Sequence, residues 1–315
     1  MAVSLVEEHP NINTVFKDTN LSVNKYDIVN LLGKGSYSNV FGAVRRNNNN
    51  KYALKKVRSK YKNFAEHEIQ ILSKLKHSNI IRLIDHFTDE GISVMVFNRY
   101  KMNLFQYMKK QLYISNYNTC MYGIKILQGL EYLKKNNIIH RDLKPENIFI
   151  NDRDLVIGDF GMSVDKHKQI FMKFNVQTVF YRAPEIFLKA DYNESLDMWS
   201  LGCIVYELYF KEPLFMKMEA DDLFIEHNKI LGPPSKEFIE RHSVITGLYD
   251  DMENPSFITL GEQRHIIHVG INTRKGMKNW KLFDFVMKCC MWEPNARLTP
   301  SAAIKQLKTL QKNDI

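Results

Sequence analysis

The spacing of hydrophobic residues changes once along this chain of 315 residues, and that change limits the folds open to it. Between Tyr26 and about Tyr100 the apolar residues form short runs separated by turn residues, which predicts β-strands. From Leu104 onward they recur at helical spacing. We therefore expect an α+β protein with a flexible polar extension (1–25), a small β-rich lobe with one main helix (26–100) and a larger α-helical lobe (101–315).

The small lobe is expected to hold five strands and one helix. The predicted strands are Tyr26–Leu32, Val40–Val44, Tyr52–Val57, Ile80–Phe87 and Gly91–Phe97. A run of Asn residues at 47–50 suits the tip of the hairpin between the second and third strands, because Asn tolerates left-handed conformations. The helix follows the third strand, and we expect Asn63 to cap it. Its inner face is marked by Ala65, Ile69, Leu72 and Leu75.

Composition predicts a folded protein with no nucleic-acid partner and no membrane association. Hydrophobic residues make up 44% of the chain, which is enough for a sizeable core. The formal net charge is +9, but Lys and Arg are spread along the chain, so we interpret it as a solvated basic surface. The longest apolar run, Met198–Phe210, is interrupted by Ser200 and Glu207 and is shorter than a bilayer span, so we expect a buried helix.

The cysteines and histidines do not suggest a metal cluster. No Cys-x-x-Cys pair occurs among Cys120, Cys203, Cys289 and Cys290. The pair in His265–His268 is too sparse for a metal site. Reduced thiols, and a start at Met1–Glu8 without a signal-peptide pattern, lead us to expect a cytoplasmic or nuclear protein, or one found in both places.

The run His140–Asn147 carries most of the chemical information. It reads His-Arg-Asp-Leu-Lys-Pro-Glu-Asn, and Asp159-Phe160-Gly161 and Ala183-Pro184-Glu185 follow it. Phosphoryl transfer from ATP needs a group that orients the attacking hydroxyl, oxygens that hold Mg²⁺ and a cation near the transferred phosphate. This run and the two motifs after it can supply all three. The order of the three motifs resembles the signature of the protein kinases. The resemblance implies a bilobal protein kinase fold.

The resemblance assigns a catalytic role to four residues. Asp142 would orient the substrate hydroxyl, and Lys144 would stabilise the transferring phosphate. Asn147 and Asp159 would bind Mg²⁺. Asp-Leu-Lys-Pro-Glu-Asn is typical of serine/threonine kinases, and Thr178 falls where those enzymes place a threonine against the catalytic Asp and Lys. The implied acceptor is therefore a Ser or Thr of a protein substrate.

A glycine-rich segment, Gly33–Val40, lies between two predicted strands. A Rossmann loop is followed by a helix instead, so the segment resembles the glycine-rich loop of kinases, although Ser38 replaces the third glycine of the family. The resemblance implies that adenine lies between Val40 and Ala53 on one side and Phe149 on the other, against the hinge Asn98–Lys101. The implied ATP-binding set is Gly33, Lys34, Gly35, Ser36, Val40, Ala53, Lys55, Glu68, Phe97, Asn98, Tyr100, Asn103, Phe149 and Asp159.

Lys55 matches the family lysine that holds phosphates and pairs with a carboxylate on the helix. Two glutamates compete for that pairing. Glu68 is three residues from Ala65 and lies beside the inner face of the helix. Glu66 is two positions from Glu68, about 200° round the helix, and should face solvent. We therefore choose Glu68.

Other matches imply structural roles. His140, Phe160, Leu72 and Leu83 resemble the family's regulatory spine, a stack that links the lobes. Asp197 matches the residue that anchors the catalytic-loop backbone. Glu185 and Arg297 match a buried salt bridge, whose disruption would leave an uncompensated charge.

Tyr181–Glu185 is typical of the CMGC group, which includes cyclin-dependent, mitogen-activated, glycogen synthase and Clk-like kinases. Ile230–Ser235 resembles the start of that group's insert, here about residues 231–278. The resemblance covers roughly residues 26–310. Membership implies a preference for proline after the phosphorylated residue.

The activation segment departs from the group's pattern. The position of the activating phosphothreonine is Lys173, and the mitogen-activated Thr-x-Tyr falls on Lys173–Asn175. Of the three arginines that gather such a phosphate only Arg141 is present, since the others align with His67 and Val164. Our hypothesis is that the segment works without phosphorylation. The helix start, 63–68, also lacks the cyclin-binding motif, so a cyclin-like activator is not supported.

Two other functions compete with an active kinase. A pseudokinase would bind partners without catalysis, but Lys55, Glu68, Asp142, Asn147 and Asp159 are all present. A nucleic-acid-binding protein would use the +9 charge and bind in a salt-sensitive way, but no recognition motif accompanies the charge.

Overall fold

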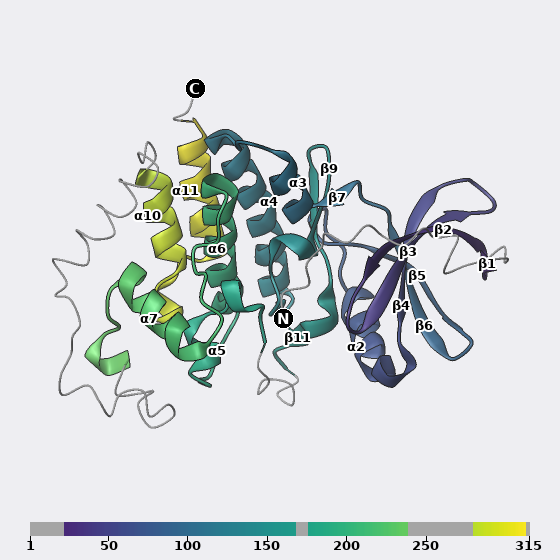
Figure 1. The fold of residues 1–315 in the computed structure, drawn as a ribbon, viewed down its shortest axis with the longest axis horizontal. Coiled ribbons are helices and arrows are strands. Elements are labelled where there is room, and N and C mark those ends of the chain that lie inside the picture. The colour runs from purple at the N-terminus through teal and green to yellow at the C-terminus, as the bar shows by residue number, and fades with distance from the viewer. Residues whose placement is uncertain (1–21, 168–175, 239–279, 313–315) are drawn as a thin grey trace. The chain divides into compact units, whose positions relative to one another are not determined.

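The computed structural model describes residues 22–167, 176–238 and 280–312 (Figure 1). These residues form two compact units. The first unit contains Ile81–Lys101 and the described residues before His77, and the second contains His77–Ile80 and the described residues from Met102 onward. The insert expected at about 231–278 lies mostly outside the described residues, as does the pair in 265–268.

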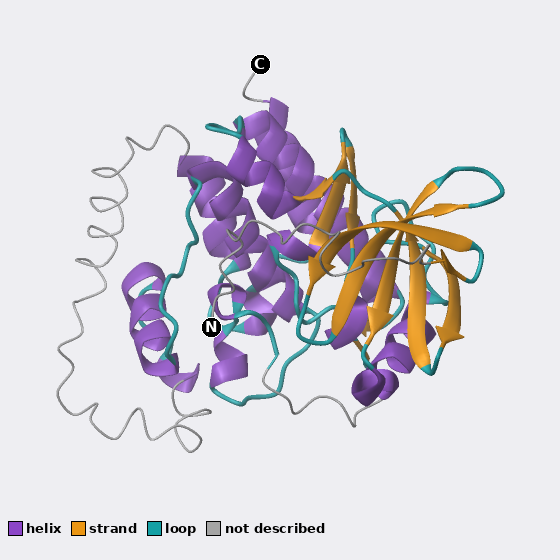
Figure 2. Ribbon diagram, turned by 45° about the vertical axis from the view of Figure 1, so that its right-hand side comes forward, coloured by secondary structure: helices purple, strands orange, loops and turns teal. Residues whose placement is uncertain are grey.

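The first unit is built on a six-stranded antiparallel sheet with the order β1-β2-β3-β4-β6-β5 (Figure 2). The strands are β1 (Ser22–Val23), β2 (Tyr26–Lys34), β3 (Ser38–Arg45), β4 (Lys51–Val57), β5 (Leu83–Asp89) and β6 (Ile92–Asn98). One side of the sheet is held together by a cluster of buried Tyr26, Ala43, Tyr52, Leu54, Val94 and Val96. Apolar and β-branched residues at alternate strand positions place these side chains on one face.

Two predictions about the strands were wrong in part. Ser22 and Val23, assigned to the flexible extension, pair with Asp27 and Tyr26 and add an edge strand to the sheet. Strand β5 begins at Leu83, three residues later than predicted. The predicted start, Ile80, instead forms an isolated bridge in the second unit, where it pairs with Ile157.

Helix α2 (Lys62–Leu72) buries Ala65, Glu68, Ile71 and Leu72. Of the predicted inner face, Ala65 and Leu72 are confirmed, Ile69 is only half-buried, and Leu75 is buried but lies beyond the end of the helix. Asn63 does not cap it, contrary to our prediction. The 3₁₀ turn η1 (Ser59–Tyr61) runs directly into α2, so Tyr61 is the N-cap residue and makes no side-chain capping bond. Asn63 is therefore the second residue of the helix and is exposed.

The second unit is largely helical. Its helices are α3 (Leu104–Lys110), α4 (Asn116–Lys135), α5 (Pro184–Phe187), α6 (Ser195–Phe210), α7 (Ala220–Leu231), α10 (Trp280–Cys289) and α11 (Pro300–Lys312). Helix α6 packs against α4 and α10, and α11 packs against α4 (Figure 1). Almost every residue of α6 is buried, which confirms the buried helix expected from the apolar run. Within the described ranges, none of the helices combines the length and the apolar character that crossing a bilayer requires.

Short strands and turns carry the residues of the catalytic run. Strand β8 (Ile138–Ile139) precedes it and pairs with β11 (Val164–Asp165), and η2 (Pro145–Asn147) ends it. Strands β9 (Ile148–Asn151) and β10 (Asp154–Ile157) form a hairpin, with β7 (Met102–Asn103) beside β9. The turns η3 (Phe160–Met162) and η5 (Val179–Tyr181) follow along the chain. Asp142 thus lies between two strands, and Asp159 lies just after a third. The four cysteines lie among the described residues, are buried and form no disulfide.

Candidate functional site

Asp142 lies at the centre of a connected group of polar side chains. Its Oδ1 accepts hydrogen bonds from the Thr178 hydroxyl (2.9 Å) and the Thr178 N–H (3.2 Å). Its Oδ2 lies 2.9 Å from the Lys144 ammonium and accepts a hydrogen bond from the Asn147 amide at 3.1 Å. Lys144 also donates to the Thr178 hydroxyl at 2.8 Å. These contacts fix the Asp142 carboxylate, whose side chain remains 15% exposed and can be reached by a further donor.

Asp197 anchors the backbone that carries Asp142, as predicted. Its Oδ2 accepts a hydrogen bond from the His140 N–H at 2.8 Å, and its Oδ1 accepts one from the Arg141 N–H at 3.0 Å. Burial raises the pKa of the Asp197 carboxyl, and the two N–H donors act in the opposite direction. Arg141 has a φ of 66°, a left-handed conformation that persists where surrounding contacts over-determine it.

Asn147 and Asp159 are linked to the same group through the backbone. The Asn147 side-chain nitrogen also donates to the Asp142 carbonyl at 2.8 Å, which leaves its amide oxygen available to a ligand. The Gly158 N–H donates to the Asn147 carbonyl at 2.8 Å, and Asp159 follows Gly158 directly. Asp159 has a φ of 57°. Phe160, the next residue, packs edge-on against the buried His140 ring, with the ring centroids 5.0 Å apart. His140 and Phe160, two of the four residues of the predicted regulatory spine, therefore pack against each other.

In the first unit, Lys55 and Glu68 form the predicted ion pair. The Lys55 ammonium lies 2.8 Å from each carboxylate oxygen of Glu68. Glu68 is buried, and Glu66 is exposed and lies 3.6 Å from Lys62. The choice of Glu68 over Glu66 is therefore confirmed.

The glycine-rich segment forms the connection between β2 and β3. Gly33 pairs with Val40 and Lys34 pairs with Asn39, and the Gly35 N–H donates to the Ser38 carbonyl at 2.8 Å. A Cβ atom added at Gly33 would meet nothing within 4 Å. Lys34, Gly35 and Ser36 are exposed, so the backbone of this loop is accessible to a ligand.

The other predicted nucleotide residues are divided between the units. In the first, Val40 pairs with Lys55, Ala53 pairs with Gly42 and Phe97, and Phe97 is buried. Asn98 ends β6 and is exposed, and Tyr100 is half-buried.

In the second unit, Phe149 is half-buried and pairs with Asn103 and Val156. Asn103 caps α3: its Oδ1 accepts from the Gln106 N–H at 2.8 Å while the Gln106 Oε1 accepts from the Asn103 N–H at 3.0 Å. The residue pattern at 103–106 was not recognised as a capping box. The nucleotide-binding roles stay predictions.

Arg141 uses its guanidinium inside the protein. Its Nε donates to the Met162 carbonyl at 2.6 Å, and its Nη1 donates to the Tyr192 hydroxyl at 2.8 Å. The residue is 4% exposed. The one arginine that remains of the expected phosphate pocket is therefore already bonded. Lys173 and its neighbours at 168–175 lie outside the described residues.

Gln177 was missed by sequence analysis and holds an unusual conformation. Its φ is 66°. Its side-chain nitrogen donates to the Ser200 hydroxyl at 2.7 Å, and its side-chain oxygen accepts from the Ala183 N–H at 2.9 Å. Its carbonyl accepts from the Arg182 guanidinium at 2.9 Å, so this acceptor is occupied next to Thr178. No residue pattern signals a left-handed Gln, so only the folded structure reveals it.

The buried acid Glu207, which lies 26 residues after Tyr181, was also missed. The Tyr181 hydroxyl donates to the Glu207 Oε2 at 2.6 Å. Burial raises the pKa of Glu207 to about 7, against the effect of the Tyr181 bond. Burial also raises the pKa of Glu146, whose Oε2 is buried with no hydrogen-bond partner among the described residues. Glu207 interrupts the apolar run of α6, which was the only signal in the sequence.

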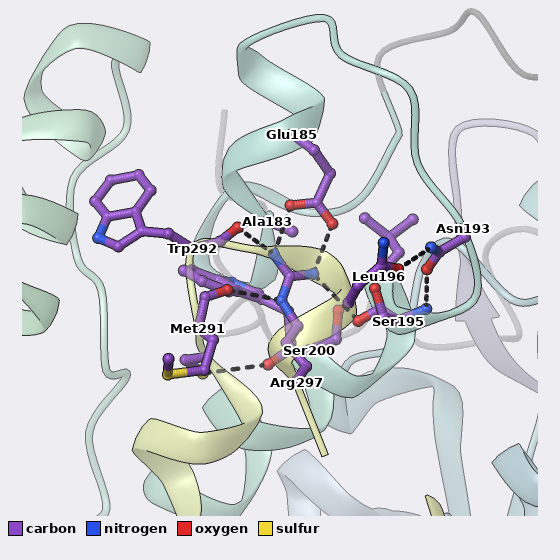
Figure 3. A network of polar contacts seen from close by, with 12 residues as sticks. Ala183, Glu185, Asn193, Ser195, Leu196, Ser200, Met291, Trp292 and Arg297 are labelled. Atoms are coloured by element: carbon purple, nitrogen blue, oxygen red, sulfur yellow. Dashed lines mark hydrogen bonds and ion pairs between the residues drawn. The ribbon is translucent and has the colours of Figure 1, made fainter. Parts of the chain in front are cut away.

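Glu185 and Arg297 form a buried salt bridge in the second unit (Figure 3). The guanidinium makes two bonds to the carboxylate, at 2.6 and 2.7 Å, with both side chains at most 1% exposed. Arg297 also donates to the carbonyls of Met291 (2.8 Å) and Ser195 (3.2 Å). The predicted salt bridge is confirmed, and it joins the starts of α5 and α6 to the segment after α10.

The family of the chain follows from comparison with known proteins. Residues 26–308 match the family described as the protein kinase domain. The chain belongs to the protein kinase domain family. The bilobal fold, with a β-sheet unit and a helical unit, is thereby confirmed.

Curated relatives refine this placement. The chain is 30% identical over 300 residues to a protein of Dictyostelium discoideum named probable serine/threonine-protein kinase dyrk2, covering 89% of this chain and 32% of that protein. It is 31% identical over 297 residues to human dual specificity tyrosine-phosphorylation-regulated kinase 4, covering 89% of this chain and 56% of that protein. These DYRK kinases belong to the CMGC group, which confirms the resemblance drawn from the motifs.

The matches to the curated relatives cover only part of those proteins. The chain spans between 32% and 56% of the length of these two relatives. A crystal structure of a kinase domain covers 90% of this chain and 94% of its own with a TM-score of 0.78, and at 24% identity it shows the fold alone.

Proposed function

We propose that this chain is an ATP-dependent serine/threonine protein kinase. The observation that carries the proposal is the Asp142 carboxylate, held by Thr178, Lys144 and Asn147 and still partly exposed. A substrate hydroxyl that reached Asp142 would donate a hydrogen bond to an oxygen already fixed in place, which is how positioning assists phosphoryl transfer. The Lys144 ammonium lies beside that oxygen and is placed to balance negative charge on the transferred group.

The donor set suits Mg²⁺. Asn147 offers an amide oxygen and Asp159 a carboxylate, and hard cations prefer such oxygens. No three His, Cys, Asp or Glu side chains gather into a metal site within 22–167, 176–238 and 280–312, but Mg²⁺ in kinases takes few protein ligands and completes its shell with phosphate and water. When bound, the ion would neutralise charge on the ATP phosphates.

We further propose that substrates carry proline after the phosphorylated residue. An ordinary residue there has a backbone N–H that needs an acceptor, whereas proline has none. The Gln177 carbonyl, next to Thr178, is already bonded to Arg182 and is a poor acceptor for such an N–H. An unpaired N–H costs free energy when it is buried, so a substrate with proline would bind at a smaller cost.

We also propose that activity does not depend on phosphorylation of the activation segment. Two relatives are named dual specificity tyrosine-phosphorylation-regulated kinases, so their names describe regulation by tyrosine phosphorylation. In this chain residues 164–177 contain no Ser, Thr or Tyr. The Arg141 guanidinium is bonded to Met162 and Tyr192, so it is engaged without a phosphate.

A transfer assay with labelled ATP tests the function. Wild-type protein, treated with phosphatase and then freed of it, should label a Ser-Pro peptide, and Asp159→Ala should not. The same peptide with Ala in place of Pro should be labelled about tenfold less, and Arg182→Ala should reduce that ratio. Equal labelling by wild type and Asp159→Ala would instead favour a pseudokinase that acts as a binding scaffold. Activity that appears only after treatment with an upstream kinase would contradict the phosphorylation-independent mechanism.

A further inference from the structure

Three aromatic residues of the first unit form a closed cluster outside the core. Tyr37 is the last residue before β3, Tyr61 ends η1, and Phe64 lies in the first turn of α2. The Tyr37 ring meets the Tyr61 ring edge-on at 4.8 Å and stacks on the Phe64 ring at 6.3 Å. The Tyr61 and Phe64 rings meet edge-on at 6.2 Å. Each ring therefore contacts the other two, in the geometries that aromatic pairs prefer.

The backbone reinforces this contact between the glycine-rich loop and the segment that leads into α2. The Arg58 N–H donates to the Tyr37 carbonyl at 3.0 Å. The Arg58 guanidinium donates to the Gly35 carbonyl at 3.3 Å. The ladder between β3 and β4 also continues as far as the pair Ser38–Val57. The tip of the loop is thus attached to residues 57–64 by main-chain, side-chain and ring contacts.

The cluster stands one helical turn from the Lys55–Glu68 pair. Phe64 and Glu68 are four residues apart on α2, so a shift of the first turn moves the carboxylate that faces Lys55. The rings are not part of the core, because Tyr37 is 54% exposed and Phe64 is 52% exposed. Their removal should therefore change the placement of the loop and helix more than it changes folding.

We propose that Tyr37, Tyr61 and Phe64 act as an intramolecular clasp that positions the glycine-rich loop and helix α2 together. The consequence of the clasp rests on the proposed kinase function. It is that nucleotide binding at the loop is energetically linked to formation of the Lys55–Glu68 pair. By reciprocity, whatever orders the loop also orders α2.

A double-mutant cycle tests the clasp. Tyr37→Ala and Phe64→Ala should each raise the KM for ATP about fivefold, while the melting temperature stays close to that of wild type. The double variant should be no worse than either single variant, because the same contact is lost each time. Tyr37→Phe, which keeps the ring, should behave as wild type. Tyr113→Ala removes an aromatic residue that is 67% exposed outside the cluster and serves as the matched control.

Hydrogen exchange separates failure of the clasp from failure of the kinase function. Without nucleotide, amides of α2 should exchange several-fold faster in Tyr37→Ala as well as in Phe64→Ala, although Tyr37 is not in the helix. Tyr37→Phe and Tyr113→Ala should leave that exchange unchanged. If Tyr37→Ala leaves α2 exchange at the wild-type rate, or if the two effects on KM simply add, the clasp is refuted. Faster exchange in a protein that transfers no phosphate would support the clasp and refute the kinase function.

Discussion

Glu207 is a buried acid whose ionisation couples stability to pH. Its pKa in the folded protein is about 7, against an ordinary value of 4.5. The folded state therefore holds a proton between these values that the unfolded state has released, so this group lowers the free energy of unfolding as pH rises from about 4.5 to about 7. Above that range the full cost, about 3 kcal/mol, is present.

Glu207→Gln should remove this contribution, since a neutral amide can still accept the Tyr181 hydroxyl. The free energy of unfolding of the variant, measured relative to that of wild type, should rise by about 2–3 kcal/mol when the pH is raised from 5 to 8. Urea unfolding at the two pH values measures the difference. A difference between variant and wild type that does not change with pH would show that Glu207 titrates normally.

Single residues also show where sequence patterns stop being informative. The roles of Asp197, Glu185 and Arg297 could be predicted because each stands at a fixed place in a motif, and the structure confirms their contacts. Gln177 could not be predicted, because no residue pattern signals a left-handed Gln, and its side-chain bonds to Ser200 and Ala183 form only in the folded chain.

Helix α3 begins with a capping box that links its stability to a predicted nucleotide contact. Asn103 is both the cap residue and a member of the predicted ATP-binding set. Asn103→Ala and Gln106→Ala should each lose about 1 kcal/mol of stability, because each breaks the reciprocal bonds of the box. Only Asn103→Ala should also raise the KM for ATP. Chemical unfolding and steady-state kinetics on both variants provide the comparison, and equal KM values would remove Asn103 from the nucleotide site.

The elements themselves were predictable in type and less so in their limits. The periodicity located β2, β3, β4, β6 and α2, because burial of one face imposes it. The start of α2 was misplaced because a 3₁₀ turn replaces a side-chain cap, and the pattern of apolar residues does not distinguish the two. Strand β1 was missed since two residues at a sheet edge are too few to show alternation.

The second unit depends on one buried ion pair for much of its integrity. Glu185 and Arg297 come from segments separated by 112 residues, and both side chains are at most 1% exposed. Arg297→Leu leaves the Glu185 carboxylate buried without its partner, which should cost about 3–5 kcal/mol. Replacing both residues by apolar ones of similar size should cost less. Equilibrium unfolding of the single and double variants checks this, and a single variant within 1 kcal/mol of wild type would contradict the role.

The division into a β-rich unit and a helical unit was expected from the single change in periodicity near residue 100. The short segment His77–Ile80 departs from it. These residues belong to the helical unit although they lie within the sequence of the other, because the Asn79 amide donates to the Leu155 carbonyl at 2.9 Å and the Asn79 carbonyl accepts from the Ile157 N–H. Such long-range pairing leaves no periodic trace.

The central claim is that the Asp142 carboxylate, fixed by Thr178, Lys144 and Asn147, serves the transfer of phosphate to a protein hydroxyl. A single-turnover experiment with Asp142→Asn tests it most directly, because the amide keeps the size and shape of the side chain and removes its charge. The rate of transfer from bound ATP should fall at least about a hundredfold, while the dissociation constant for ATP stays within about twofold of wild type. A transfer rate equal to that of wild type, in a variant that binds ATP normally, would contradict the account.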